Sequence, residues 1–341
     1  MQIGIDTTAA GADVGETVTA FPLLVRLDAR NFAFAEARRD GADVRFLDSS
    51  GNNLAYEIER WNADKAVAEI WVLVPRIIGS SRNNYVLMYW GNPLSATTSS
   101  GPSVFGGYSW VFHMGEDPNN PATQFEDDSA QNSAGTLLSP TRVDSRVEGA
   151  IGTGLALDGL SVLTTARPLP SPNPVAIALW IKTQSSTGGG IAGFASTPAS
   201  DADAPHDRFV AMDSSGRLSF SILRTPALAT VTSLASYNDG QWHFVVARFS
   251  SSGQYLFVDG EDVADDPTVT SANSYPGYWR FGEEPPPTAS ASLADAAIAG
   301  NYFTGTIDEA RISTDEPSDA WIKLSYATQR PDASTVIFPI P

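Results

Sequence analysis

Apolar and polar residues alternate along the start of the chain. Phe21, Leu23, Val25 and Leu27 occupy every second position. A period of two residues is typical of a β-strand with one buried face. Further strands are predicted where apolar runs are bounded by turn-forming residues, at 43–47, 56–61, 68–74 and 84–90. Together these elements predict a small all-β domain over residues 1–100.

This periodicity is lost between residues 94 and 107, where Ser, Thr and Gly dominate. Such a composition is typical of an exposed segment that joins two domains. We therefore place a linker here and expect the second domain to span residues 108–341. Its predicted strands are short: 154–157, 175–182, 190–194, 208–212, 218–224, 278–281 and 305–312. Many short strands with spacers of about ten residues indicate a sandwich or a jelly roll.

The chain ends with a predicted helix and a final strand. Residues 319–329 place Trp321 and Leu324 on one helix face, with Asp319 as the expected cap. Residues 335–338 form the last strand, which must find a sheet to join. The residues expected in the core of the second domain are Trp180, Ile181, Phe194, Phe220, Trp242, Val245, Phe257 and Ile307.

The most informative segment runs from Asn238 to Gly260. It reads NDGQWHFVVARFSSSGQYLFVDG. Two apolar runs, 242–249 and 255–258, are separated by a Ser/Gly turn, and an Asp-Gly pair stands at each end. This arrangement predicts a β-hairpin.

The hairpin resembles the most recognisable hairpin of laminin-G-like (LamG) modules, which have a concanavalin-type jelly roll. Further motifs of the second domain match such modules in order: VFHMGE (111–116), DSAQNSAGT (128–136), GLALDG (154–159), ALWIKT (178–183), DGQWHFVVARF (239–249), LFVDG (256–260) and GTIDEARIS (305–313). The resemblance implies a family of binding modules rather than of catalysts.

The first domain resembles a bacterial domain of unknown function that often precedes such modules. The matching segments are IDTTAAGADV (5–14), the stretch 21–51, YEIERW (56–61), AEIWVLVP (68–75) and YVLMYWGNP (85–93). The expected fold is all-β, with two β-sandwich domains, the second a concanavalin A-like LamG jelly roll, and a short C-terminal helix. The pairing implies an exported protein. Some similar proteins are encoded beside ExbB/ExbD-type energy transducers, which implies the cell envelope.

Composition narrows the possible partners. The 341 residues carry a net charge of −18, which disfavours nucleic acid and anionic membranes. There is no cysteine, so disulfides and thiolate metal sites are excluded. No run of 18 apolar residues is present, so no segment is expected to insert into a membrane. The first residues read as a strand and not as a signal peptide, and we expect an export signal outside this sequence.

A calcium site is the first candidate chemistry. In concanavalin-type sandwiches a Ca²⁺ ion commonly joins the first and last strands, and the residues at matching positions are Glu116, Asp128, Asn132 and Asp308. Ca²⁺ takes six to eight oxygen ligands. The family loop usually reads DSSGNGN, and Ala130 and Gln131 depart from it. The alternative is that these acids cap turns, beside a strand-edge ion pair such as Glu309–Arg311.

A glycan surface is the second candidate. Sugar rings stack on exposed aromatic side chains flanked by polar groups. The residues expected to bind a ligand are Tyr237, Tyr275, Tyr278, Trp279 and Arg280. The alternative is that Trp279 begins a core strand and Tyr275 packs on a turn.

Catalysis has weaker support. Glu57 and Glu59 stand two residues apart on a predicted strand, a spacing of roughly 6.5–7 Å that suits a pair of glycosidase carboxylates. A solvated strand face explains the same pattern. His113, His206 and His243 are the only histidines, and buried, hydrogen-bonded roles are expected for those in strand motifs. No nucleophile elbow, zinc helix or phosphate loop is present.

The sequence therefore predicts a non-enzymatic, exported binding module of the bacterial surface or periplasm, with a role such as adhesion. Its partner would be a glycan or a surface protein, with Ca²⁺ ordering a loop. We expect a monomer in isolation that is part of a larger protein or envelope complex. The alternatives are a structural or assembly domain of an envelope complex linked to ExbB/ExbD-type transducers, and a glycoside hydrolase.

Overall fold

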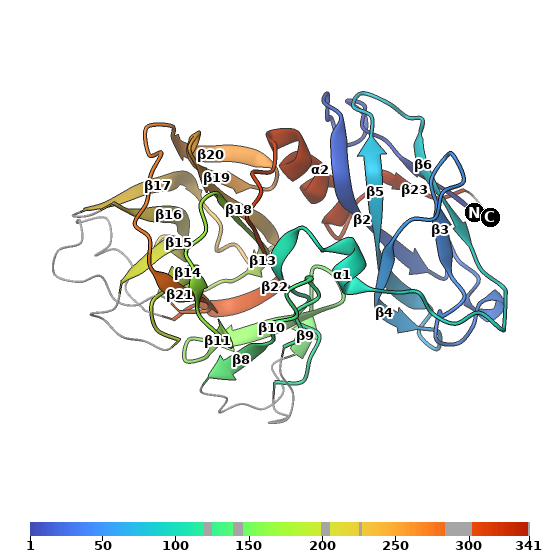
Figure 1. Ribbon diagram of the computed structural model, residues 1–341, viewed down its shortest axis with the longest axis horizontal. Coiled ribbons are helices and arrows are strands. Elements are labelled where there is room, and N and C mark those ends of the chain that lie inside the picture. Colours follow the sequence, from blue (N-terminus) through green and yellow to red (C-terminus); the bar gives the residue numbers. More distant parts are fainter. Residues whose placement is uncertain (119–124, 139–145, 199–204, 225–226, 284–301, 340–341) are drawn as a thin grey trace. The chain divides into compact units, whose positions relative to one another are not determined.

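The computed structural model describes residues 1–118, 125–138, 146–198, 205–224, 227–283 and 302–339. Strands dominate it, and the chain divides into two compact units (Figure 1). The first unit holds residues 1–106, 128–130 and 318–341, and the second holds 107–127 and 131–317. The all-β prediction is confirmed. Among the described residues, no helix has the length and apolar character needed to cross a membrane.

Two sheets form the first unit. One has the order β23-β1-β6-β3 and the other β2-β5-β4. The bounds are β1 Gln2–Ile5, β2 Val18–Asp28, β3 Arg45–Leu47, β4 Tyr56–Asn62, β5 Val67–Ile77, β6 Asn84–Tyr89 and β23 Val336–Ile337. Phe21, Leu23, Val25 and Leu27 all lie in the core of this unit, as their alternation predicts. A short 3-10 turn, Phe34–Glu36, and the helix α1, Gly101–Val104, complete it.

The C-terminal segment belongs to the first unit and not, as predicted from its position in the sequence, to the second domain. The helix α2, Asp319–Gln329, has the predicted bounds, but its cap is Ser318, whose hydroxyl accepts the amide hydrogen of Trp321 at 3.2 Å. Leu324 is fully buried in the core of the first unit. The final strand β23 pairs with β1, so the last strand finds its sheet at the opposite end of the sequence.

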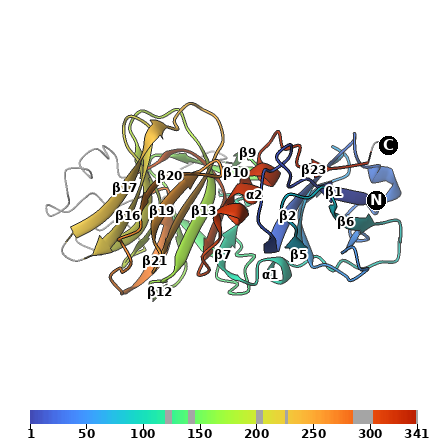
Figure 2. The ribbon, with the colours of Figure 1, turned by 90° about the horizontal axis from the view of Figure 1, so that it is seen from above.

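The second unit is built from two large antiparallel sheets (Figure 1). One has the order β20-β19-β18-β13-β22-β10-β9, with β7 also paired to β22. The other has the order β17-β16-β15-β14-β21-β11-β8, with β12 paired to β21. In the view of Figure 2 the axes of the long strands of this unit are roughly aligned, with neighbouring strands running in opposite directions.

The strands of the first of these sheets are β7 Tyr108–Phe112, β9 Arg146–Glu148, β10 Thr153–Asp158, β13 Val175–Lys182, β18 His243–Ser250, β19 Gly253–Val258, β20 Glu261–Asp266 and β22 Thr304–Ser313. Those of the second sheet are β8 Gly135–Leu138, β11 Val162–Thr165, β12 Leu169–Pro170, β14 Gly189–Ala195, β15 His206–Met212, β16 Arg217–Arg224, β17 Ala227–Ser236 and β21 Pro276–Phe281. The predicted hairpin is present as β18 and β19, paired from Val245–Val258 to Ser250–Gly253.

The core between these sheets agrees with most of the prediction. Five of the expected core residues lie in it: Ile181, Phe194, Phe220, Val245 and Ile307. Trp180 and Phe257 are buried but lie outside this cluster, because their strand neighbours Ile181 and Val258 take the inward positions. Trp242 is only half-buried, with the Lys182 ammonium 5.8 Å from its ring centroid, so its place in the core was wrongly predicted.

Candidate functional site

Two of the predicted calcium ligands of the second unit have protein partners. Asp308 is fully buried in β22, and its Oδ2 accepts the amide hydrogen of Ile151 at 2.9 Å. Glu116 Oε1 accepts the amide hydrogen of Glu126 at 2.7 Å, and burial raises the pKa of the Glu116 carboxyl. Asn132 is exposed. Within the described part of this unit, no group of three His, Asp or Glu ligand atoms at binding distance includes Glu116 or Asp308.

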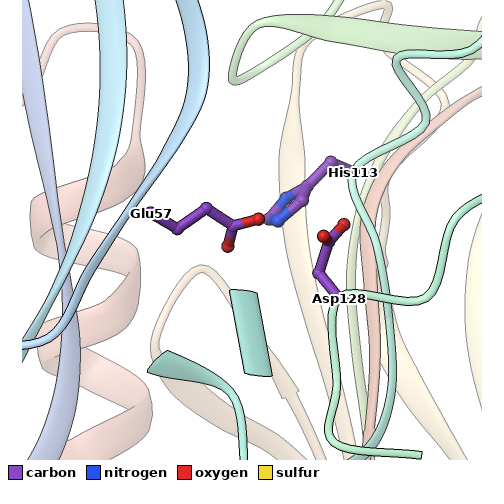
Figure 3. A group of neighbouring side chains, drawn as sticks. All are labelled: Glu57, His113 and Asp128. Atoms are coloured by element: carbon purple, nitrogen blue, oxygen red, sulfur yellow. The ribbon is translucent and has the colours of Figure 1, made fainter. Parts of the chain in front are cut away.

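The fourth predicted calcium ligand, Asp128, belongs to the first unit. One of its carboxylate oxygens lies within 4.8 Å of one from Glu57 on β4. Figure 3 shows the two side chains, together with His113 of the second unit. A Cβ on Gly101 would come within 2.7 Å of the Asp128 Cβ, so the missing side chain there lets Asp128 approach α1. Two carboxylates are fewer oxygens than Ca²⁺ requires.

The anticipated ion pair between Glu309 and Arg311 is present on β22. His113 also joins it, because its Nδ1 lies 2.7 Å from Glu309 Oε1. All three side chains are buried. Burial alone would raise the pKa of Glu309, but the charges of His113 and Arg311 outweigh it and hold this pKa at about 2. The arrangement is a buried charge network, and His113 has the hydrogen bond expected of a buried histidine.

Three residues of the hairpin motif meet at one end of β18. His243 Nδ1 lies 2.8 Å from Asp259 Oδ2, and its Nε2 lies 3.1 Å from Asp239 Oδ1. Asp259 also accepts the amide hydrogen of Phe244 at 2.9 Å. Tyr237, a predicted ligand contact, is half-buried here with its ring centroid 5.0 Å from that of His243. The motif therefore joins the two turns at the open end of the hairpin, opposite the turn between Ser250 and Gly253.

The remaining predicted ligand contacts lie on or just before β21. Trp279 is 1% exposed and packs against Phe194 in the core, so its ring offers no surface to a sugar. Tyr275 packs on the same core, and its hydroxyl donates to the Phe194 carbonyl at 3.1 Å. Tyr278 remains partly exposed. The structure thus supports the core alternative for Trp279.

Arg280, the last residue of the predicted set, is also buried. Its guanidinium forms an ion pair with Glu283, and the two side chains are 1% and 0% exposed. Tyr302 pairs with Glu283 through an antiparallel bridge and is partly exposed. Burial raises the pKa of the Tyr302 hydroxyl, and the Glu283 carboxylate raises it further. Sequence reasoning missed Glu283 and Tyr302, since they lie 19 positions apart in the chain and no motif contains them.

Glu57 and Glu59 do not keep the simple spacing of a regular strand. The pairing register of β4 with β5 shifts between Ile58 and Arg60, which places Glu59 at an irregularity. Glu59 Oε2 accepts the indole hydrogen of Trp71 at 2.8 Å. The sequence argument for a carboxylate pair rested on regular alternation, which this strand lacks.

Comparison with family models finds two matches. Residues 158–323 match the concanavalin A-like lectin/glucanases superfamily, and residues 40–122 match a domain of unknown function, DUF2341. Both agree with the resemblances carried by the sequence motifs. No curated protein matches the chain.

Several solved structures are similar to part of the chain. Domain 4 of an extracellular arabinanase from Geobacillus stearothermophilus, in complex with arabinotriose, is 18% identical over 63% of this chain and 96% of that one, with a TM-score of 0.46. The ligand binding domain of botulinum neurotoxin serotype D, in complex with N-acetylneuraminic acid, is 13% identical over 67% and 52%, with a TM-score of 0.43. A pentraxin from Limulus polyphemus is 13% identical over 50% and 80%, with a TM-score of 0.36. At these values, what those proteins bind does not carry over to this chain.

Proposed function

Because the chain holds a concanavalin A-like lectin/glucanase domain behind a DUF2341 domain, we propose that it is a non-catalytic binding module whose ligand is a glycan. The family match over residues 158–323 is the observation that carries this proposal. The fold also hosts other functions, so the ligand has to be argued from the site. The proposed setting is the outside of a bacterial cell or its periplasm, as part of a larger envelope protein.

The side chains available to a glycan are those that the fold leaves partly exposed. Tyr278 on β21 and Tyr237 before β18 keep part of their rings at the surface, whereas Trp279 does not. An aromatic face beside polar groups is the usual platform for a sugar ring. The proposed glycan contacts are therefore Tyr278 and Tyr237, with Trp279 anchoring β21, the strand of Tyr278, in the core.

A structural calcium ion is the second part of the proposal. Its candidate ligands are Glu116, Asn132 and Asp308, all in the second unit; Asp128 belongs to the first unit and is not part of this site. Carboxylate and amide oxygens are the ligands that Ca²⁺ prefers. Thermal melting of the intact protein in Ca²⁺ and in chelator tests this part alone.

The test of the whole proposal is a glycan array, run once in Ca²⁺ and once in chelator. We expect binding to one class of sugar that is lost in Tyr278→Ala. The matched control is Tyr89→Ala, because Tyr89 is a half-exposed tyrosine of the first unit, with 50% of its surface accessible. A ligand at about 100 times its Kd should also stabilise the protein by about 2.7 kcal/mol.

An array without signal in either condition would refute glycan binding. The role of a structural or assembly domain in an envelope complex would then be the hypothesis to pursue, through a search for a protein partner. Release of sugar from the array, abolished by Glu57→Gln or Glu59→Gln, would instead indicate a glycoside hydrolase.

A further inference from the structure

The four-stranded sheet of the first unit has an outer face that points away from the core. On β1, Ile3 and Ile5 lie in the core, so alternation directs Gln2 and Gly4 outward. Figure 2 shows β1 beside β6 and β23, and the pairing register aligns outward residues of these strands and of β3 with those of β1. The residues of this outer face are Gln2, Gly4, Arg45, Leu47, Tyr85, Leu87, Tyr89 and Ile337.

The outer face is mostly apolar and accessible to solvent. Tyr89 and Ile337 are 50% and 47% exposed, which places them among the exposed large hydrophobic residues of the chain. Leu47, Tyr85 and Leu87 on the same face are partly exposed. Single exposed apolar side chains are normal on a protein surface, whereas a contiguous group of them marks an interaction site.

Among the residues of this face only Arg45 is charged, and its guanidinium is engaged within the first unit. Nη1 donates to the carbonyl groups of Ala42 at 3.0 Å and Val44 at 2.6 Å, and Nη2 donates to the carbonyl of Ala96 at 2.6 Å. A partner on this face would therefore be held by apolar contact and not by an ion pair.

Gly4 leaves the middle of the outer face without a side chain. It pairs with Tyr85 on one side and with Ile337 on the other. The fold does not require glycine here, because a Cβ would lie 3.5 Å from the Ile337 Cβ, an ordinary contact, and Gly4 is not among the glycines with positive φ. Glycine inside a strand weakens the strand and often marks a place where another molecule approaches closely. The position therefore suits a side chain supplied by a partner.

The size of the face favours a single helix over a second copy of the chain. β6 has 6 residues and is roughly 20 Å long, and four strands spaced about 4.8 Å apart are about 15 Å across. The resulting area of about 300 Å² is well below the roughly 800 Å² that each partner contributes to a stable interface. An α-helix is about 10–12 Å wide and three turns of it are about 16 Å long. One helix therefore covers this face along β6.

The net charge of the chain indicates the polar side of that helix. At −18, two copies of the chain repel each other, whereas a basic partner is attracted. We propose that the outer face binds an amphipathic helix of another protein. The apolar side of the helix contacts Tyr85, Tyr89 and Ile337 and places one side chain against Gly4, and its polar side carries Lys and Arg. This role lies beyond the proposed glycan binding and does not depend on it.

The probe for this face is a fluorescent synthetic peptide of about 18 residues made of leucine and lysine, with leucine at i, i+3, i+4 and i+7. Its anisotropy is followed as the intact chain is added. Tyr89→Ser and Ile337→Ser should each weaken binding about tenfold, since each removes an apolar contact. The matched control is Ile78→Ser, because Ile78 is 48% exposed but follows β5 in the other sheet. All three substitutions keep the net charge, so general attraction of a basic peptide to an acidic protein is equal in all of them.

Gly4→Val separates binding from folding. Valine suits a strand and lacks the conformational freedom of glycine, so the Tm of the first unit should rise. The same side chain occupies the position left for the partner, so the peptide should bind about tenfold more weakly. A residue with a structural role alone would not combine a higher Tm with weaker binding.

The outcomes distinguish the possible occupants of the face. Equal affinity of the peptide for the intact chain, Tyr89→Ser and Ile337→Ser would overturn the proposal, as would no binding by the intact chain. Tighter binding of a peptide in which leucine and lysine alternate would indicate strand addition at the edge strand β23 instead. Tighter binding of the same helix with glutamate for lysine would refute the charge argument. A dimer in sedimentation equilibrium that Ile337→Ser abolishes would assign the face to a second copy. None of these results bears on the glycan array, which is read separately.

Discussion

Replacement of His243 should destabilise the second unit in a way that depends on pH. Each ring nitrogen of His243 faces a carboxylate, Asp259 at 2.8 Å and Asp239 at 3.1 Å. A neutral imidazole has one N–H and can donate to only one of them, so the protonated ring suits this site. Burial lowers the pKa of His243, but hydrogen bonds and charge from the two aspartates outweigh it, and the pKa is raised above 6.5.

Because the pKa of His243 is raised on folding, its stabilisation of the fold is greatest at low pH. A histidine whose pKa is raised in the folded state contributes its full stabilisation below the unfolded pKa, about 6.5. The contribution is lost as the pH rises through the folded pKa. A charge-assisted hydrogen bond contributes roughly 1.5–3 kcal/mol. Asp239 is 55% exposed and its bond adds little, so the pairing with Asp259 dominates. His243→Phe should therefore cost about 2 kcal/mol at pH 6.

Urea unfolding of the intact chain and of His243→Phe, from pH 5.5 to pH 9, measures this difference. In a thermal melt of the same two proteins, a loss of about 2 kcal/mol in a unit of this size corresponds to a fall in Tm of about 4–8 °C. The penalty should shrink above the folded pKa. His206→Phe is the control, because His206 contacts Phe209 by its ring and lies outside the aspartate pair. A penalty that stays constant across the range, or a His243 pKa below 6.5 by NMR, would refute the reasoning.

Three further predictions concern stability. Leu324→Ala should destabilise the first unit by about 2–5 kcal/mol in thermal melting, because Leu324 is fully buried in its core. The control is Lys323→Ala, which removes a partly exposed ion pair and should cost about 1 kcal/mol or less. The pKa of Glu309 is about 2 in the folded protein, against an ordinary value of 4.5. The Glu309 carboxylate therefore stabilises the fold above pH 4.5, and this stabilisation is lost as the pH falls toward 2. The free energy of unfolding of Glu309→Gln should depend less on pH in this acid range than that of the intact protein. Asp308→Ala should lower the Tm and abolish any difference between Ca²⁺ and chelator, and equal melting of the intact protein in both would contradict the calcium ion.

Central strands could be predicted from the sequence because the buried and the exposed face of a strand take different residue types at alternate positions. The alternation of Phe21, Leu23, Val25 and Leu27 reflects one buried face, and all four lie in the core. The edge strands were missed for the converse reason. In β20, Glu261–Asp266, four of six residues are acidic, and in β17, Ala227–Ser236, large apolar residues are few. An edge strand pairs on one side only, so its sequence carries little pattern.

The C-terminal helix shows a different limit. Its bounds follow from local signals, and Asp319–Gln329 is helical as predicted. Which domain it joins depends on contacts between residues far apart in the chain, such as Val336 with Ile5 and Leu324 with the first core. Periodicity indicates that one face of the helix is apolar, but it does not identify the core against which that face packs. Assigning the helix to the second domain from its position in the sequence was therefore wrong.

Family motifs identified the fold better than the ligand because most motif residues serve the structure of the module. Asp239, His243 and Asp259 of the hairpin motif bond to one another and to the backbone, so their chemistry is used in closing turns. A residue used in this way is needed whatever the module binds. Groups that recognise a ligand must instead retain exposed surface, as Tyr278 does. Binding specificity should therefore respond to substitutions around β21 and not to those in the hairpin, where the expected loss is of stability alone.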